Sequence, residues 1–230
     1  MLQFPEQWMK NASLGEQIAN ELRLLILTNE IKPGDIISEN QIARKYGTSR
    51  SPVRDALKAL ANDGLIQLER MGARVLGMGL ADIHELYDVR EMIEIFAQQR
   101  VSAAPQEQLI QFLNETIDKM KIAAKYENHS DFAYYDFSFH DRIIRHAGHK
   151  RILNIWNGMK SLIMAVLLVT TEDVFAHGPG HLAWVIEKHR KIVNSLLTGN
   201  EENVEQSVSA YFKDSKRTLD KSFPEEGKTE

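Results

Sequence analysis

The sequence predicts a mainly α-helical protein, built from a winged helix-turn-helix followed by an antiparallel all-helical bundle. Two observations carry this prediction. Residues 1–77 contain short helical patterns interrupted by Gly and Pro, whereas residues 80–230 show helical periodicity almost throughout. Charge divides the chain at the same place, because residues 1–79 hold ten Lys/Arg against nine Asp/Glu and residues 80–230 hold eighteen against twenty-three. We expect two domains, 1–77 and 80–230, with a linker at 78–79.

The composition excludes several classes of protein. A chain of 230 residues with 43% hydrophobic residues can bury a substantial core. It contains no cysteine, which excludes disulfide scaffolds, thiolate zinc fingers and thiol nucleophiles. The longest strongly apolar run, 162–169, is shorter than the roughly 20 residues of a membrane-spanning helix. The first residues also lack the features of a signal peptide. We therefore expect a cytoplasmic protein without a membrane segment.

The first predicted helix begins at a capping box formed by Ser13 and Glu16, after which four apolar residues recur at helical spacing. A Lys-Pro-Gly-Asp sequence breaks this helix. Residues 36–37 suit a very short strand. A second capping box at 38–41 then opens a short helix that ends at Gly47.

A third helix and a hairpin complete the first domain. Ser51 is the expected N-cap and Pro52 the first helical residue, where the missing N–H of proline costs nothing. An Asn-Asp-Gly sequence stops the helix. Residues 66–69 alternate like a strand, and after a turn at 71–72 a second strand returns over 74–76.

Six helices are predicted in the second domain, separated by a proline, a polar stretch, single glycines and a Gly-Pro-Gly turn. Their expected ranges are 80–102, 106–127, 131–147, 150–171, 181–198 and 201–222. His177 and His181 flank the Gly-Pro-Gly turn, so we expect them in a loop. Residues 225–230 are expected to form a frayed polar tail.

The order helix, tight turn, helix and hairpin is that of a winged helix-turn-helix, in which the second helix of the pair enters the DNA major groove. The residues at the start of that helix are Ser49, Arg50, Ser51 and Arg54. Arginine can contact guanine through two hydrogen bonds, and hydroxyls suit phosphates. Arg70 flanks the hairpin tip, and residues 39–75 hold seven Lys/Arg against four Asp/Glu. Solvated surface charge is the alternative, which the complete order of elements disfavours.

Several segments match known signatures. Those in the first domain are Ser38–Ala43, Gly47–Leu57, Leu60 and Gly64–Ile66. They resemble the DNA-binding signature of GntR-superfamily transcriptional regulators. In the second domain, residues 87–91 and 136–140 resemble the FCD effector domain of the FadR branch. Residues 68–73 and 87–90 are similar to those of gluconate-operon repressors of Gram-positive bacteria.

This resemblance implies which residues contact DNA. Arg50 and Arg54 would contact the operator with help from the hydroxyls of Ser49 and Ser51, and the wing glycine, Gly72, would enter the minor groove. An arginine often found on the preceding helix in this family is Asn40 here. The resemblance further implies a homodimeric repressor on a pseudo-palindromic operator, because two reading heads match two half-sites.

A candidate ligand site lies inside the predicted bundle. Asp136 and His140 are one helical turn apart and share a face, and His189 lies on another apolar stripe. A carboxylate and two imidazoles suit a divalent metal such as Zn, Ni or Mn, while hydrogen-bonded buried histidines are the alternative. Metal-binding FCD domains have Asp and His at these positions, so the resemblance implies a metal. Their third His is Tyr211 here, which is a poor neutral ligand and is expected to hydrogen-bond to the effector.

The effector implied by the resemblance is a small carboxylate, a sugar acid such as gluconate. Arg90 offers a bidentate partner for it, and His140 and His189 are further candidates. An ion pair between Arg90 and Glu94, four residues on, is the alternative. Two other functions stay open: a metal-free lipid-like or acyl effector, and a helical metalloenzyme. The enzyme would need a nucleophile or an acid/base pair near the ligands, and neither is recognisable.

Overall fold

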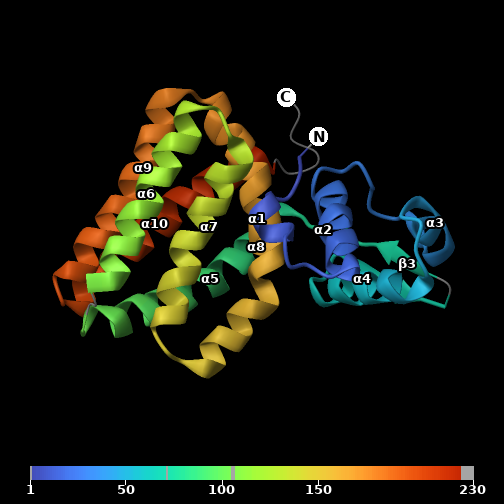
Figure 1. Cartoon of the computed structure of the whole chain (residues 1–230), viewed down its shortest axis with the longest axis horizontal. Helices are drawn as coiled ribbons and strands as arrows, with labels where there is room; N and C mark the ends of the chain where they lie inside the picture. Colours follow the sequence, from blue (N-terminus) through green and yellow to red (C-terminus); the bar gives the residue numbers. More distant parts are fainter. Residues whose placement is uncertain (1, 71, 105–106, 224–230) are drawn as a thin grey trace.

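The computed structural model describes residues 2–70, 72–104 and 107–223, and Figure 1 shows a helical bundle beside a smaller part that contains a sheet. The smaller part contains α1 (Glu6–Met9), α2 (Leu14–Leu27), β1 (Ile36–Ser38), α3 (Glu39–Lys45), α4 (Arg50–Asn62), β2 (Ile66–Glu69) and β3 (Gly72–Val75). The bundle contains α5 (Leu80–Ser102), α6 (Glu107–Lys125), α7 (His129–His146), α8 (Lys150–Ala176), α9 (Pro179–Leu197) and α10 (Glu201–Ser222). The predicted fold class is thereby confirmed. The predicted turn residue Met71, the separator Pro105 and the tail 225–230 lie outside the described residues.

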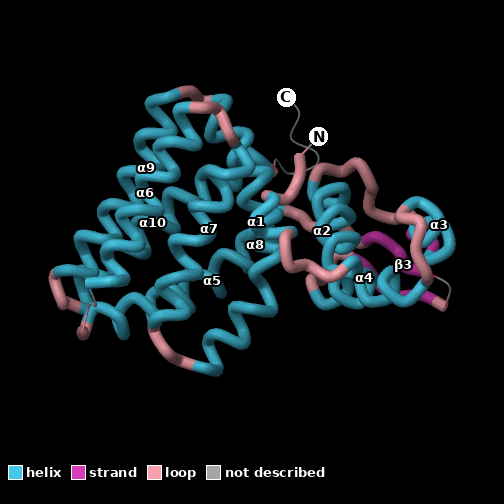
Figure 2. Tube along the Cα trace, viewed as in Figure 1, coloured by secondary structure: helices cyan, strands magenta, loops and turns pink. Residues whose placement is uncertain are grey.

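The smaller part is a winged helix-turn-helix. Its antiparallel sheet has the order β1-β3-β2, with Ile37 and Leu68 both facing Ala73, and Figure 2 shows the strands beside α3 and α4. The predicted short strand at 36–37 is therefore present. Packing of α2 on α4 supplies the core, and a buried ion pair reinforces it, with Arg23 Nη2 2.6 Å from Asp63 Oδ2.

Two of the predicted helix caps need correction. The capping box at Ser13 and Glu16 is present, with both reciprocal hydrogen bonds formed. By contrast, Ser38 precedes α3 without a side-chain cap bond. The N-cap of α4 is Ser49 rather than Ser51, because Ser49 has an extended backbone and Arg50 is already helical. Proline is tolerated throughout a first helical turn, so Pro52 does not fix the first residue.

The bundle differs from its predicted ranges mainly at the Gly-Pro-Gly turn. Gly178 is the N-cap of α9 at φ 83°, and Pro179 is its first residue. His181 therefore lies on the helix, which corrects its assignment to a loop, while His177 caps the end of α8.

The longest helix of the described residues, α8, lies on the side of the bundle that faces the smaller part (Figure 1). It is long and apolar enough to cross a membrane by those two criteria alone. Its apolar residues are used inside the protein, because Trp156 and residues 162–168 are buried. α8 packs against α7, α9 and α10 within the bundle and against α2 outside it.

A short helix that the sequence did not predict, α1, lies where the two parts meet (Figure 1). Trp8 packs edge-on against Phe137 of α7 with ring centroids 4.8 Å apart, and the Lys160 ammonium lies 5.8 Å from the Trp8 ring. Gln7 donates a hydrogen bond to Asp131 at 3.2 Å. The segment before α2 is therefore attached to the bundle, although it precedes the winged helix in the chain.

Candidate functional site

The start of α4 presents the residues predicted to read DNA. Ser49, Arg50, Ser51 and Arg54 are all exposed, as is Arg70 at the end of β2. Arg54 forms an ion pair with Glu39 of α3, with Nε 3.0 Å from Oε2. An exposed pair of this kind contributes little to stability and can be exchanged for a phosphate or a base. The exposed positions of these arginines allow them to reach a ligand outside the protein, for Arg54 by exchanging its Glu39 partner.

Gly72, the predicted wing glycine, lies at the end of the hairpin where β2 and β3 are joined. It is buried at the start of β3, opposite Ser38 of β1 and Glu69 of β2. A Cβ at this position would overlap the carbonyl oxygen of Ile37. The close approach of two strands therefore explains the glycine, and the predicted contact of Gly72 with the minor groove stays a prediction.

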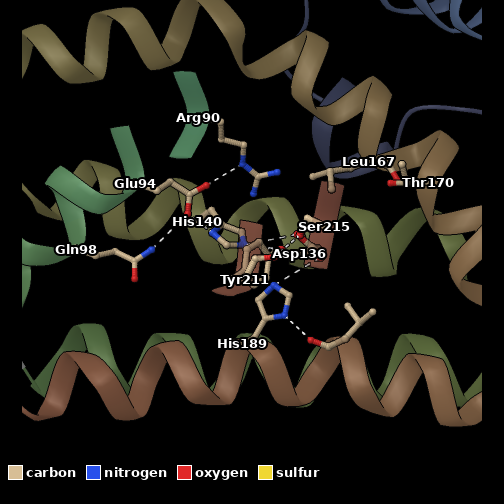
Figure 3. A network of polar contacts seen from close by, with 11 residues as sticks. Arg90, Glu94, Gln98, Asp136, His140, Leu167, Thr170, His189, Tyr211 and Ser215 are labelled. Carbon is tan, nitrogen blue, oxygen red and sulfur yellow. Dashed lines mark hydrogen bonds and ion pairs between the residues drawn. The ribbon is translucent and has the colours of Figure 1, made fainter. Parts of the chain in front are cut away.

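The bundle brings the predicted ligand residues together around a buried centre (Figure 3). α7 supplies Asp136 and His140, α9 supplies His189 and α10 supplies Tyr211. All four are at most 6% exposed. The candidate ligand atoms of Asp136, His140 and His189 lie within 4.8 Å of one another. A fifth residue, Glu94 of α5, joins this group.

Hydrogen bonds fix the orientation of both imidazoles. His140 Nδ1 lies 2.5 Å from Glu94 Oε2 and donates to it, and His189 Nδ1 donates to the Val185 carbonyl at 2.9 Å. Both Nε2 atoms therefore face Asp136, at 3.7 Å from its Oδ1 for His140 and 3.5 Å from its Oδ2 for His189. Asp136 Oδ1 and His189 Nε2 are buried and have no hydrogen-bond partner among the described residues.

These residues fit a divalent metal. Two imidazoles and a carboxylate are a common ligand set, and second hydrogen bonds from the ring nitrogens typically orient metal-binding histidines. The unpartnered atoms of Asp136 and His189 are ones that a cation would satisfy. Tyr211 opposes this arrangement, because its hydroxyl donates to His140 Nε2 at 3.0 Å and uses the same lone pair. Metal binding therefore requires the Tyr211 hydroxyl to turn away.

Charges in the site are set by burial and by their neighbours. Burial by itself would raise the pKa of Asp136, but His189, His140 and Arg90 hold it below its usual range. Burial lowers the pKa of His140, although the Glu94 carboxylate acts in the opposite direction. The lowered pKa favours the neutral imidazole ring. Burial also raises the pKa of Tyr211 well above its usual value. The site thus holds an ionised carboxylate and a protonated phenol.

Arg90 makes the predicted alternative contact. Its Nε donates to Glu94 Oε1 at 2.8 Å, and both side chains are buried. Its Nη1 and Nη2 have no hydrogen-bond partner in the part of the chain that the structure describes. Arg90 lines a small cavity of about 40 Å³ with Asp136 and Tyr211. The intrahelical ion pair thus leaves the fork of the guanidinium available to a ligand.

Comparison with known proteins places the chain in a family. The FCD domain family matches residues 85–214, and the gntR family of bacterial regulatory proteins matches residues 14–75. The gluconate operon transcriptional repressor of Bacillus licheniformis is 34% identical over 213 residues, and that of Bacillus subtilis (strain 168) is 36% identical. Each alignment covers 93% of this chain and 88% of the relative. The chain belongs to the GntR family.

Other proteins similar to this GntR-family chain include a further repressor and a solved structure with the same fold. A probable D-xylose utilization operon transcriptional repressor of Paenarthrobacter nicotinovorans is 26% identical, with 87% of this chain and 86% of the relative covered. Among solved structures, E. coli McbR/YncC has a TM-score of 0.72 at 19% identity, over 92% of this chain and 99% of that one, which shows the shared fold. The relatives are transcriptional regulators, so the expectation of a regulator rather than an enzyme is confirmed.

Sequence reasoning missed two parts of this regulator's site. Lys188 of α9 is buried beside the same cavity, and burial lowers its pKa to about 8. Hydroxyl groups also line the cavity, from Thr170 and Thr171 of α8 and from Ser215 and Thr218 of α10. A lysine directly before a buried histidine was the available signal for Lys188. The hydroxyls gave none, because single Ser and Thr residues in helices are ordinary.

Proposed function

We propose that this GntR-family chain is a transcriptional repressor whose affinity for its operator changes when a small organic acid binds the bundle. Residues 1–77 form the DNA-binding domain, 78–79 the linker, and 80–230 the effector domain. The effector is a sugar acid of the gluconate type. Similarity to gluconate operon repressors over 93% of the chain supports the effector class.

The observation that carries an anionic effector is the guanidinium of Arg90. A buried cation with two unpartnered nitrogens is costly unless an anion pairs with it. A carboxylate accepts two parallel hydrogen bonds from such a fork. Beside it, the side-chain hydroxyls of Thr170 and Ser215 donate to backbone carbonyls, which leaves their lone pairs free to accept from hydroxyls of a sugar acid. The cavity has the polarity that a polyhydroxy acid needs.

Asp136, His140 and His189 would hold a divalent metal, Zn, Ni or Mn. When bound, the metal supplies a fixed positive charge with open positions for an oxygen ligand. Tyr211 would then donate its hydrogen bond to the effector instead of to His140. The cavity of about 40 Å³ is close to the volume of one water molecule in the liquid, roughly 30 Å³. A sugar acid can therefore enter only if helices around the cavity move, which links binding to a change in shape.

The N-terminal segment supplies a route for that change. Phe137 follows Asp136 on α7 and packs against Trp8, which precedes α2 by only a few residues. Movement of α7 when its ligand residues engage an effector is passed through Trp8 to the DNA-binding domain. Coupling then follows from the difference in effector affinity between the two arrangements of the domains.

A homodimer completes the proposal. α5 exposes Val89, Met92 and Phe96 at helical spacing, at 36%, 63% and 40% exposure. On α8, Ile155 is exposed as well, and Gly158 has open space where a Cβ would stand. An apolar face with a glycine allows close approach of helices from a second copy. Two DNA-binding domains would then read a pseudo-palindromic double-stranded operator in the cytoplasm.

Thermal unfolding tests the effector assignment. The full-length protein is melted with a panel of sugar acids, small carboxylates and acyl or lipid-like compounds, each with and without a chelator, because a ligand of the folded state raises the midpoint. An acid that raises the midpoint is then added to a gel-shift assay with operator DNA. We expect a sugar acid to be active in both assays. Stabilisation by acyl or lipid-like compounds alone would refute the proposal.

A further inference from the structure

Lys188 is a buried cation that the proposed function leaves without a role. It is 6% exposed, and in the described part of the chain it forms no hydrogen bond or ion pair. Its ammonium instead lies over two rings, 4.4 Å from the Trp184 centroid and 4.7 Å from that of Tyr211. Contact with ring faces compensates a cation less than burial costs it. A negatively charged group beside Lys188 would meet that cost.

Two cations therefore face one cavity. Arg90 reaches it from α5 and Lys188 from α9, and Asp136 and Tyr211 line it with them. Arg90 is only partly neutralised, since Glu94 takes its Nε while Nη1 and Nη2 stay unpartnered. A ligand in this cavity meets a positive charge from each of two helices.

The buried charged side chains of the site have no net charge before a metal or a ligand binds. Arg90 and Lys188 contribute two positive charges, and Glu94 and Asp136 contribute two negative ones. The metal proposed for Asp136 raises the net charge by two. Uncompensated charge inside a protein is expensive, so a ligand with two negative charges suits the loaded site better than one with a single charge.

We propose that Lys188 is a second anion anchor, and that the effector is a polyhydroxy acid with two anionic groups. This inference rests on the proposed function, because it names the charge class of the acid bound at that site. One anionic group pairs with Arg90 and the metal, and the other pairs with Lys188. The hydroxyls of Thr171 and Thr218 meet the carbon chain between them. A second carboxylate and a phosphate share the required chemistry.

Calorimetric titration of the full-length protein, loaded with one equivalent of Zn²⁺, tests this inference. The probes are gluconate with one carboxylate, glucarate with two, and 6-phosphogluconate with a carboxylate and a phosphate. We expect at least one doubly charged acid to bind about 10-fold more tightly than gluconate, as an added charge-assisted contact provides. The two doubly charged probes distinguish a carboxylate from a phosphate at Lys188.

Variants of Lys188 test whether this side chain causes the preference for doubly charged acids. Lys188→Met should weaken binding of the doubly charged acid by about 10- to 100-fold and binding of gluconate by less than about 3-fold. Lys188→Arg should restore most of the lost affinity. Lys191→Met is the matched control, since Lys191 is exposed on the same helix. The rise in melting temperature with Zn²⁺ alone shows that each variant is folded.

Two results would overturn the inference and leave the proposed function intact. One is that gluconate binds wild-type protein as tightly as both doubly charged acids, a comparison that needs no variant. The other is that Lys188→Met weakens all three acids equally. If none of the acids binds the wild-type protein, the proposed function itself is refuted.

Discussion

Replacing Asp136 by Asn tests whether Asp136 is a metal ligand or only a buried polar residue. In the folded protein, Asp136 Oδ1 lies 3.7 Å from His140 Nε2, and Oδ2 lies 3.5 Å from His189 Nε2. The pKa of Asp136 lies below its usual value because His189, His140 and Arg90 outweigh the cost of its burial, so its negative charge stabilises the folded protein. Asparagine has nearly the same shape but carries no charge. The D136N variant should therefore be less stable without metal and bind metal poorly.

The magnitudes follow from the geometry. Loss of the Asp136 charge leaves the buried cations beside it less compensated and costs about 1–3 kcal/mol, so the metal-free variant should melt below metal-free wild type. For wild type, metal at 100 times its dissociation constant contributes about 2.7 kcal/mol. In a chain of this length, that raises the melting temperature by about 5–11 °C. The variant should lose this rise.

Differential scanning calorimetry on chelator-treated protein measures both effects as Zn²⁺, Ni²⁺ or Mn²⁺ is added. Asp118→Asn is the control, because Asp118 is exposed on α6 and pairs only with Lys121 among the described residues. It should keep the metal-dependent rise. An equal rise in D136N and wild type would refute the assignment of Asp136 as a ligand. No rise in wild type with any of the three metals would refute the metal site.

Four further predictions test other parts of the molecule. Arg54→Ala should weaken specific operator binding by about 1–3 kcal/mol without unfolding the protein, and unchanged affinity and base preference in a gel-shift assay would exclude α4 as the reading helix. Trp8→Ala should leave effector binding intact by calorimetry but reduce the effect of that ligand on operator affinity; an unaltered effect would remove Trp8 from the route. Phe96→Asp should shift light-scattering mass from dimer to monomer, whereas a persistent dimer would place the interface elsewhere. Because burial lowers the pKa of His140, the unfolded chain gains a proton that the folded chain lacks, so the unfolding free energy of chelated protein should fall as pH drops below about 6.5. His140→Gln should flatten that slope in denaturant titrations, and an equally steep slope would contradict a neutral His140.

Local signals predicted the secondary structure well where one interaction dominates. The capping box at Ser13 depends on two side chains three residues apart, and both bonds form. The same pattern at Ser38 does not form a capping box. Ser38 is the last residue of β1 and pairs with Gly72 in the sheet, and its side chain makes no cap bond. A four-residue helix such as α1 has too few residues for any periodicity. Trp8 is helical there because it packs on the bundle, and distant packing leaves no local trace.

The site was only partly visible for the same reason. Asp136 and His140 share a helical face, so their spacing alone joined them. His189 and Tyr211 come from α9 and α10, and the resemblance to other family members rather than periodicity linked them to that face. Glu94 was expected as a partner of Arg90, and its second contact, with His140, needed the packing of α5 on α7. Gly72 was matched to a wing tip, while the contact with Ile37 that explains it lies across the sheet.

The sequence by itself determined the fold class, the order of elements and the two candidate surfaces, because helical periodicity, caps and turn residues act over one or two turns of chain. Tertiary structure alone decided which polar atoms are buried without partners. The guanidinium nitrogens of Arg90, the Oδ1 of Asp136 and the Nε2 of His189 come from different helices, and they form a ligand site only because burial removes water from all of them at once. That shared loss of solvent converts three ordinary polar residues into a site that favours a metal and an acid.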